Sequence, residues 1–435
     1  ITLKPVRVGI CGFGTVGGGT FNVLQRNCEE ITRRTGRAIV VEHIAQRRPN
    51  VNCDTGNTAI TDDIFAVANN PDIDVLVELI GGHEPAKELV LTAIRNGKHV
   101  VTANKALIAE HGNEIFEAAR KYNVVVAYEA AIAGGIPIVK ALREGLAANS
   151  INWLAGIING TGNFILTEMR DKGRAFADVL KEAQELGYAE ADPTFDVEGI
   201  DAAHKLTILS SVAFGIPLQF DQCYTEGISK VSAEDVANAE SLGYRIKHLG
   251  LTRRTEAGIE LRVHPTLIPE KRLIANVHGV MNAVLVDGNA VGPTMYYGAG
   301  AGAEPTASSI VADLVDVVRD MAVDQNVRMP SLAFQQDAMS DSPILSMDNV
   351  VTAFYMRMAV SEKPGVLAQI TQILGNAGIS IEAIRQQTHV SSQVPVIILT
   401  RPVLEGHMND AIKAIEALAD VSGEVTRIRV ENLDG

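Results

Sequence analysis

The segment 187–210 holds the residues whose types and spacing are best suited to acid–base chemistry. It reads GYAEADPTFDVEGIDAAHKLTILS, with several carboxylates, a histidine and a lysine ahead of an apolar run. From Gly199 onward the apolar residues recur at helical intervals. On that helix Asp201 and Lys205 are four residues apart and therefore neighbours on one face. The alternative is a solvated helix start, because acids are favoured near a helix N-terminus.

A nucleotide-binding element is expected at the start of the chain. Residues 6–11, VRVGIC, are typical of a buried parallel strand, and a helix is expected after them. Between the two lies a GxGxxG motif formed by Gly12, Gly14 and Gly17. The first glycine allows a tight turn, the second lets a pyrophosphate approach the backbone, and the third permits close helix packing. This context favours a dinucleotide site over a purely structural turn.

Further strands alternate with helical stretches, which predicts an α/β fold with a mainly parallel sheet. We expect these strands at 39–45, 75–78, 99–102 and 124–127. One of them ends at Thr102, and Lys105 follows at the start of a helix. Ligands sit at the carboxyl ends of such strands, so Lys105 can reach nicotinamide or substrate. A surface lysine is the alternative, although the helix dipole disfavours a cation there.

The cofactor preference is predicted from the end of the second strand. An NAD site commonly has an acidic residue there, whereas this chain has Gln46, Arg47 and Arg48. Paired guanidinium groups suit a 2′-phosphate, which favours NADP over NAD. Use of both cofactors stays open, and a solvated basic loop is the alternative.

The middle of the chain contains two glycine-rich segments of interest. Residues 129–137, EAAIAGGIP, suit a hinge between domains or a site for a hard monovalent cation. Residues 157–166, IINGTGNFIL, suggest a strand broken at Gly160–Gly162, where backbone N–H groups line a crevice. More strands of a second domain are expected around 261–269 and 283–286.

A second Gly/Ala loop, YGAGAGAEP at 297–305, precedes a helix for which Thr306 and Ser308 are plausible caps. We expect this helix to pack back onto the first domain and to place the loop over the cofactor crevice.

The tail is predicted to be a separate module after a linker rich in Pro, Ser and Asp. Its pattern is βαββαβ, which is the ferredoxin-like order. The elements are expected at 351–360, 366–376, 379–389, 394–402, 408–419 and 424–430.

Length and composition limit the functional classes. A chain of 435 residues suits two or three domains. The formal net charge of -14 argues against nucleic acid or an anionic membrane as the main partner. The four cysteines have no zinc-type spacing, and we expect reduced thiols in a cytoplasmic protein. No apolar run approaches the roughly 20 residues of a membrane span.

Several of these segments together resemble homoserine dehydrogenase, in its monofunctional form. The segments that carry the resemblance are VGICGFGTVGGG at 8–19, GKHVVTANKALIA at 97–109, NGTGNFILTEM at 159–169, GYAEADPTFDVEGIDAAHKL at 187–206 and GAGAEPTASSIVADL at 300–314. The tail, with EKPGVLAQITQILGNAGISI at 362–381, is similar to an ACT domain, a small-ligand sensor. The resemblance covers nearly the whole chain.

The resemblance implies roles for individual residues. Lys205 and Lys105 correspond to lysines of proton transfer and substrate positioning, and we expect Asp201 to orient Lys205. The implied pocket for homoserine or aspartate 4-semialdehyde comprises Gly160, Thr161, Tyr188, Glu190, Asp196, Asp201 and Lys205. The implied nucleotide site comprises Gly12, Phe13, Gly14, Thr15, Val16, Gly17, Arg47, Arg48, Thr102, Lys105, Gly302 and Glu304. A sodium ion is implied at Glu129, Ile132, Gly134 and Ile136, mostly through carbonyl oxygens.

The implied organisation has a Rossmann domain at 1–133 completed by a returning helix near 304–323, and an α+β substrate and dimerisation domain at 134–303. A linker at 324–349 and an ACT domain at 350–435 follow. We expect threonine to bind the ACT domain at Pro364, Gly365, Val366, Leu367, Asn376 and Ile379. A dimerisation module without ligand response is the alternative. We expect a homodimer or homotetramer.

Two other functions stay open at this point. One is a different NADP-linked amino-acid oxidoreductase, such as an oxidative deaminase. The other is a non-catalytic sensor that binds nucleotide and amino acid as signals, although a sensor has no need of two lysines at the cofactor crevice.

Overall fold

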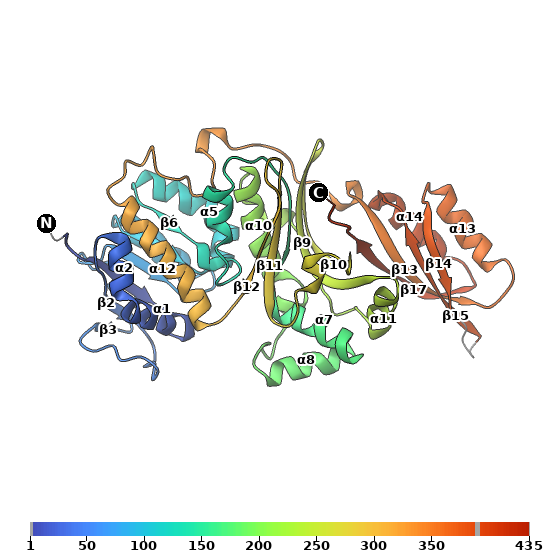
Figure 1. Ribbon diagram of the computed structural model, residues 1–435, viewed down its shortest axis with the longest axis horizontal. Helices are drawn as coiled ribbons and strands as arrows, with labels where there is room; N and C mark the ends of the chain where they lie inside the picture. The colour runs from blue at the N-terminus through green and yellow to red at the C-terminus, as the bar shows by residue number, and fades with distance from the viewer. Residues whose placement is uncertain (1–2, 388–391, 435) are drawn as a thin grey trace. The chain divides into compact units, whose positions relative to one another are not determined.

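A computed structural model describes residues 3–387 and 392–434 of the chain. The chain forms two compact units that interleave along the sequence (Figure 1). The first unit comprises residues 1–160, 201–223 and 280–342, and the second comprises residues 161–200, 224–279 and 343–435. The domain boundaries expected from the sequence stay predictions.

The first unit contains a parallel sheet in the order β3-β2-β1-β4-β5-β6. This is the strand order of the dinucleotide-binding Rossmann fold. The strands are apolar because both faces of the sheet are covered. Their bounds are β1 Val6–Cys11, β2 Ile39–Ala45, β3 Ala59–Thr61, β4 Val75–Glu78, β5 His99–Thr102 and β6 Val126–Ala127. The last strand is shorter than predicted.

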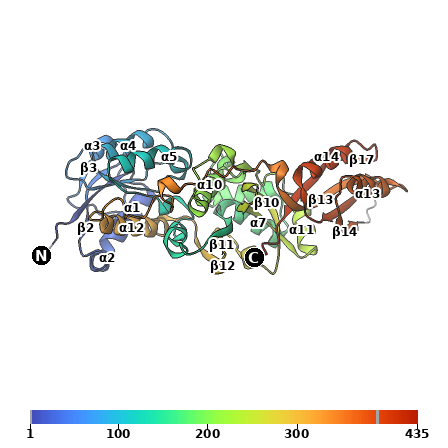
Figure 2. The same cartoon turned by 90° about the horizontal axis from the view of Figure 1, so that it is seen from above.

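Helices cover both faces of this sheet (Figure 2). One layer contains α1 Thr15–Arg26, α2 Cys28–Thr35 and α12 Ala303–Asp320. The other contains α3 Ile64–Ala68, α4 Ala86–Arg95 and α5 Lys105–Lys121.

The helix α12 returns to pack on α1, as the sequence predicts. A Cβ at Gly19 would lie 2.7 Å from the Ala303 carbonyl oxygen, so only glycine allows this approach. The predicted caps were wrong: Gly302, with φ +124°, precedes the helix, and Thr306 and Ser308 lie inside it.

The rest of the first unit includes a three-stranded antiparallel arrangement and the buried helix α10. The strands β7 Ile151–Ile157, β11 Met281–Gly288 and β12 Gly292–Ala299 pair in the order β12-β11-β7. Helix α10 spans Ile200–Phe214. Short helical turns occur at Glu129–Ala131, Ile138–Lys140 (α6), Ala141–Gly145, Phe220–Gln222 and Gln336–Ala338.

The interpretation of 157–166 as a broken strand was wrong. The strand β7 ends at Ile157, and helix α7 spans Gly160–Lys172. A helix forms because Ile165, Leu166 and Met169 fall on one buried face. Gly160 is required by a close backbone approach, since a Cβ there would lie 2.7 Å from the Val280 carbonyl oxygen.

The second unit packs helices against a long antiparallel hairpin. The hairpin strands are β9 Tyr244–Thr255 and β10 Gly258–Pro269, which confirms the strand expected near 261–269. The other elements are α7, α8 Phe176–Glu185, α9 Thr194–Val197, β8 Tyr224–Thr225, α11 Ala233–Ser241 and the short turns Leu273–Asn276 and Met347–Asn349.

The tail has the predicted βαββαβ order and one additional short strand. Its sheet has the order β17-β13-β15-β14, and β17 also pairs in parallel with β10. The elements are β13 Val351–Ser361, α13 Val366–Asn376, β14 Ile381–Gln386, β15 Gln393–Thr400, β16 Val403–Leu404, α14 Glu405–Glu416 and β17 Val421–Val430. Residues 388–389 of the expected strand 379–389 lie outside the described residues.

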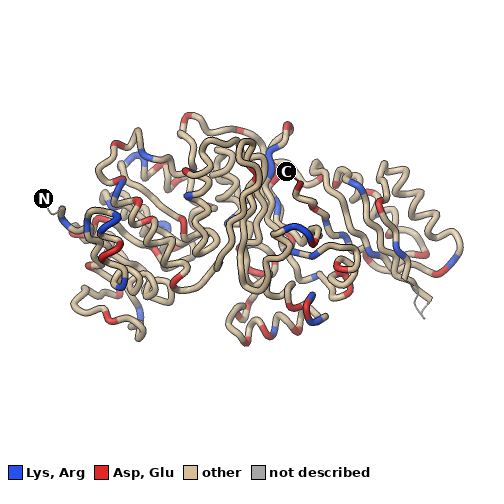
Figure 3. Tube along the Cα trace, in the orientation of Figure 1, with Lys and Arg blue, Asp and Glu red and all other residues tan. Residues whose placement is uncertain are grey.

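Acidic and basic residues are interleaved along both units (Figure 3). In α2, for example, Glu30 pairs with both Arg33 and Arg34. Within the described ranges, none of the helices combines the length and apolar character that crossing a membrane requires.

Candidate active site

The carboxylate of Asp201 is the centre of the candidate site in the first unit. One oxygen, Oδ1, lies 2.9 Å from the Lys105 amine. The other, Oδ2, accepts hydrogen bonds from the Lys205 amine at 2.9 Å and from the Asn159 amide at 2.8 Å. Asp201 is only 4% exposed, so these partners replace its water. The structure therefore brings together the three residues expected to be catalytic.

Three elements converge on this carboxylate. Helix α10 carries Asp201 and Lys205 one turn apart, and it is buried from Asp201 to Phe214. Lys205 also donates to the Ile158 carbonyl at 2.7 Å, just after β7. Lys105 is the first residue of α5, whose N-cap is the Asn104 side chain. A cation is unfavourable at a helix start, and Asp201 offsets that cost.

Asp201 forms a cluster with Lys105, Lys205 and Asn159, and the electrostatics of this cluster follow from the short distances. Burial on its own raises the pKa of the Asp201 carboxyl. The charges of Lys205 and Lys105 and the hydrogen bonds from Lys205 and Asn159 outweigh burial and hold that pKa well below its usual 3.8. Asp201 is therefore ionised at neutral pH and keeps two amines close together.

A second polar pair adjoins the cluster on α10. His204 Nε2 lies 2.8 Å from Glu110 Oε1 on α5. Burial lowers the pKa of His204, although the bond to Glu110 acts in the opposite direction. The pair connects α5 to α10 beside both lysines. The sequence analysis pointed to the histidine but not to Glu110.

The N-terminus of α1 borders a cavity of about 420 Å³. It is lined by Phe13, Gly14, Thr15, Gly18, Gly19, Asn22, Arg48, Pro49, Asn50, Val51, Asn52, Cys53, Ala303 and Glu304. A Cβ at Gly14 would meet no atom within 4 Å, so the backbone there is open to a ligand. A Cβ at Gly17 would lie 2.2 Å from the Gly12 carbonyl oxygen, and Gly12 has φ +96°. These features fit a pyrophosphate at a helix N-terminus.

The other residues predicted to bind the nucleotide differ in their burial and in their contacts. Arg48 and Glu304 line the cavity, and Glu304 pairs with Arg26 at 2.7 Å. Arg47 is exposed, while Val16 packs partly against the core. The Thr102 hydroxyl donates to Glu78 at 2.6 Å and accepts from the Asn104 N–H. Its donor hydrogen is therefore engaged by a hydrogen bond inside the protein.

The residues predicted to bind a cation lie around a buried turn. Both Glu129 carboxylate oxygens accept backbone N–H bonds, from Val139 at 2.9 Å and from Lys140 at 2.8 Å. Burial raises the pKa of Glu129 despite these bonds. The Gly134 carbonyl accepts from Ser309, and the Ile136 carbonyl accepts from the Ile138 N–H. Ile132 is fully buried. The Glu129 carboxylate thus accepts from free backbone N–H groups in the first turn of α6. The sequence did not indicate this role.

The residues predicted to bind substrate are divided between the units. Gly160 belongs to the first unit, whereas Thr161, Tyr188, Glu190 and Asp196 belong to the second. The Thr161 hydroxyl donates to the Tyr188 carbonyl at 2.5 Å. Tyr188 and Glu190 are exposed, and Asp196 is half-buried.

The predicted effector residues occupy the two ends of α13. Gly365 precedes the helix with φ +88°, and Pro364 stands before it. Val366 and Ile379 are buried, Leu367 is half-buried, and Asn376 is the last residue of the helix.

Two important residues, Asn159 and Glu78, were missed by the sequence analysis. Asn159 belongs to the NGTGN stretch, where attention fell on the glycines. Glu78 is fully buried at the end of β4 and accepts from the Ile80 and Gly81 N–H groups and from Thr102. An acidic residue that ends an apolar strand was the available signal.

A Rossmann sheet, an open glycine turn and two lysines paired with one buried carboxylate are features of a nicotinamide-dependent oxidoreductase. Family comparison agrees. The description "Homoserine dehydrogenase, NAD binding domain" matches residues 12–129, "Homoserine dehydrogenase" matches 137–315, and "ACT domain" matches 356–420. The chain is 69% identical to the homoserine dehydrogenase of Pseudomonas aeruginosa over 99% of its length and 100% of that protein. The chain belongs to the homoserine dehydrogenase family.

Solved structures agree with this assignment. A homoserine dehydrogenase from Thiobacillus denitrificans has a TM-score of 0.95 and 64% identity, covering 99% of each chain. A hyperthermophilic archaeal homoserine dehydrogenase in complex with NADPH has a TM-score of 0.61 and 26% identity, covering 73% of this chain and 98% of that one. The predicted fold class and enzyme class are confirmed.

Replacement of Asp201 by Asn is expected to lower stability strongly. The variant leaves two amines without a buried anion, and breaking such a pair costs about 3–5 kcal/mol. The contribution of a carboxyl with a lowered pKa is complete above its unfolded value of 3.8 and is lost as the pH falls below it. Urea midpoints at several pH values measure the effect.

The exposed Asp62→Asn variant is the matched control and should unfold like the wild type. A loss in Asp201→Asn that stayed constant from pH 7 to well below pH 4 would contradict the assignment of the ionised carboxylate.

Proposed function

We propose that the protein interconverts L-homoserine and L-aspartate 4-semialdehyde by hydride transfer with NADP, and that Lys205 transfers the proton. The observation that carries this proposal is the pairing of Lys205 and Lys105 with one buried carboxylate. The family assignment supplies the reaction class, and the cluster supplies named groups for it.

The residues of the cluster have different roles in the oxidation of the substrate. In its neutral form, the Lys205 amine takes the proton of the substrate hydroxyl as the carbon–oxygen double bond forms, and the resulting ammonium returns the proton in the reverse direction. Asp201 fixes the Lys205 amine through one hydrogen bond, and the Ile158 carbonyl fixes it through another. Lys105 positions the substrate oxygen. A nicotinamide cofactor, when bound, would supply the hydride acceptor and donor for the same carbon.

Recognition of the amino acid requires groups of both charges. Homoserine carries an ammonium group that suits the carboxylates of Glu190 and Asp196, both in the segment 187–210. Its α-carboxylate suits backbone N–H groups at Gly160 and Thr161, because the Thr161 hydroxyl already donates to the Tyr188 carbonyl.

Preference for NADP is proposed on the basis of Arg48. A guanidinium beside the cavity at the start of α1 can pair with a 2′-phosphate. Arg47 is exposed in the same loop and is proposed as a second partner.

A sodium ion is proposed near Glu129, Ile132, Gly134 and Ile136. Hard monovalent ions take oxygen ligands, and a carboxylate oxygen that accepts one N–H keeps capacity for another partner. Such an ion would stabilise the turn between the nucleotide-binding region and β7.

Regulation by threonine through the tail is proposed, with placement of the enzyme in threonine, methionine and isoleucine biosynthesis. The left-handed Gly365 and the start of α13 supply backbone groups for an amino acid. A cytoplasmic location and a homodimer or homotetramer are part of the same proposal. The edge strand β12, with Tyr297 exposed, is a candidate for pairing between copies.

The reaction is tested by following reduced nicotinamide absorbance with L-homoserine, using NADP and NAD in parallel, with and without threonine. Turnover that favours NADP and falls with threonine is expected. Arg48→Ala should raise the KM for NADP and leave that for NAD unchanged. Binding of nucleotide and homoserine without turnover, in a folded sample supplied with sodium, would favour a sensor instead.

Replacement of Lys205 by Met is expected to lower kcat by at least about 100-fold, because a positioned proton acceptor contributes that much or more. Lys121→Met, at the exposed end of α5, is the matched control and should retain wild-type turnover. Circular dichroism checks that both variants fold. Near-normal kcat with only a raised KM in Lys205→Met would transfer the proton role to Lys105 or to water.

A further inference from the structure

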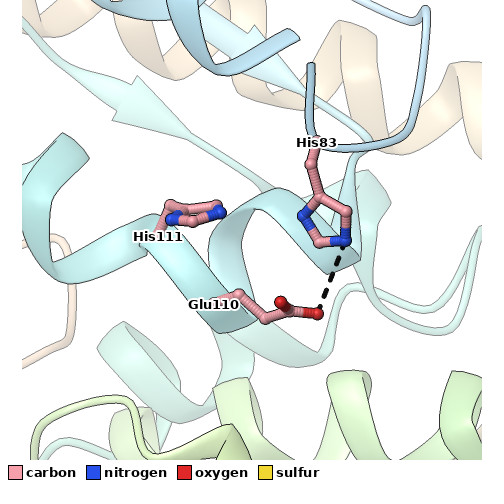
Figure 4. A group of neighbouring side chains, drawn as sticks. All are labelled: His83, Glu110 and His111. Carbon is pink, nitrogen blue, oxygen red and sulfur yellow. Dashed lines mark ion pairs between the residues drawn. The ribbon is translucent and has the colours of Figure 1, made fainter.

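We propose that His83, Glu110 and His111 bind a divalent transition-metal ion, such as Zn²⁺, on the first unit. Figure 4 shows the three side chains gathered between the loop after β4 and helix α5. Each offers one ligand atom, and all three atoms lie within 4.8 Å of one another. Two imidazoles and one carboxylate form a donor set typical of zinc sites that keep an open position.

The spacing suits a small ion. Bonds of about 2.0–2.2 Å to nitrogen and oxygen place two tetrahedral ligands roughly 3.3–3.6 Å apart. His83 Nε2 and Glu110 Oε1 lie 3.6 Å apart (Figure 4). The rings of His83 and His111 meet edge to face with their centroids 5.6 Å apart. The ligand atom of His111 lies within 4.8 Å of those of His83 and Glu110.

The backbone that carries His83 is held on both sides, so the site is largely formed in advance. Glu78 accepts from the Gly81 N–H at 3.0 Å, and the Asn104 amide donates to the Gly82 carbonyl at 2.7 Å. After His83, its own carbonyl accepts from the Lys87 N–H at the start of α4. Asn104 also caps α5, which carries the other two ligands. The loop and the helix are therefore fixed to each other by one side chain.

The carboxylate has the outer partner that metal ligands commonly have. Glu110 Oε1 lies 2.8 Å from Nε2 of the buried His204, and this contact orients the carboxyl group. His83 and Glu110 are exposed, which gives an ion a route from solvent. The site differs from the sodium site proposed at Glu129, because imidazole nitrogens select softer ions than carbonyl oxygens do.

The test is a titration of the untagged, full-length protein with Co²⁺, followed by its visible ligand-field absorption, and with Zn²⁺, followed by calorimetry. One equivalent of metal per chain is expected to bind. The variants His83→Ala, His111→Ala and Glu110→Gln should each weaken binding by more than about tenfold. Gln keeps an oxygen for His204, so this variant isolates the loss of the charged ligand.

His407→Ala, which removes an exposed histidine of α14, is the matched control and should bind like the wild type. Thermal unfolding checks that each variant is folded. The proposal is overturned if the wild type binds no metal, if the three ligand variants bind as well as His407→Ala does, or if a sulfur-to-cobalt charge-transfer band shows that Cys28 or another thiol is the ligand.

Discussion

The buried carboxylate of Asp201 is the constraint around which the first unit is arranged. An ionised carboxylate without water is costly unless charges and hydrogen bonds compensate it. Lys205, Lys105 and Asn159 provide that compensation at 2.8–2.9 Å. The same contacts bring two ammonium groups together, which their mutual repulsion would otherwise prevent. Stability and proposed catalysis thus depend on one set of distances.

The parallel sheet supplies the second half of the arrangement. The strands β1, β4 and β5 end at the same edge, and their last residues lead to Gly12, to the Glu78 network and to Lys105. Glu78 holds the loop after β4, while Thr102 supports the Asn104 N–H at the start of α5. These hydrogen bonds therefore connect the loop after β4 with the helix that carries Lys105.

The chain leaves the first compact unit after residue 160 and returns to it at residue 201. Residues 161–200, which include the acidic residues of the segment 187–200, belong to the second unit. Asn159 lies one residue before Gly160, where the first segment of the first unit ends, and Asp201 is the residue at which the chain returns to that unit. Substrate residues proposed at Thr161, Tyr188, Glu190 and Asp196 lie on the chain between these points. The acid–base cluster therefore belongs to one unit, and most of the proposed substrate ligands belong to the other.

Much of this protein was determined by its sequence alone. Local sequence patterns are enough to predict the glycine turn after an apolar strand and the βαββαβ order of the tail. The four-residue spacing of Asp201 and Lys205 likewise predicts that they lie on one face of a helix. The tertiary structure decided what depends on distant partners. Examples are the need for glycine at position 160, set by the approach of the Val280 backbone, and the pairing of Lys105 with Asp201 across almost a hundred residues of chain. Glu78, Asn159 and the Glu110–His204 pair were missed for the same reason. Their importance comes from burial beside specific partners, which no local pattern encodes.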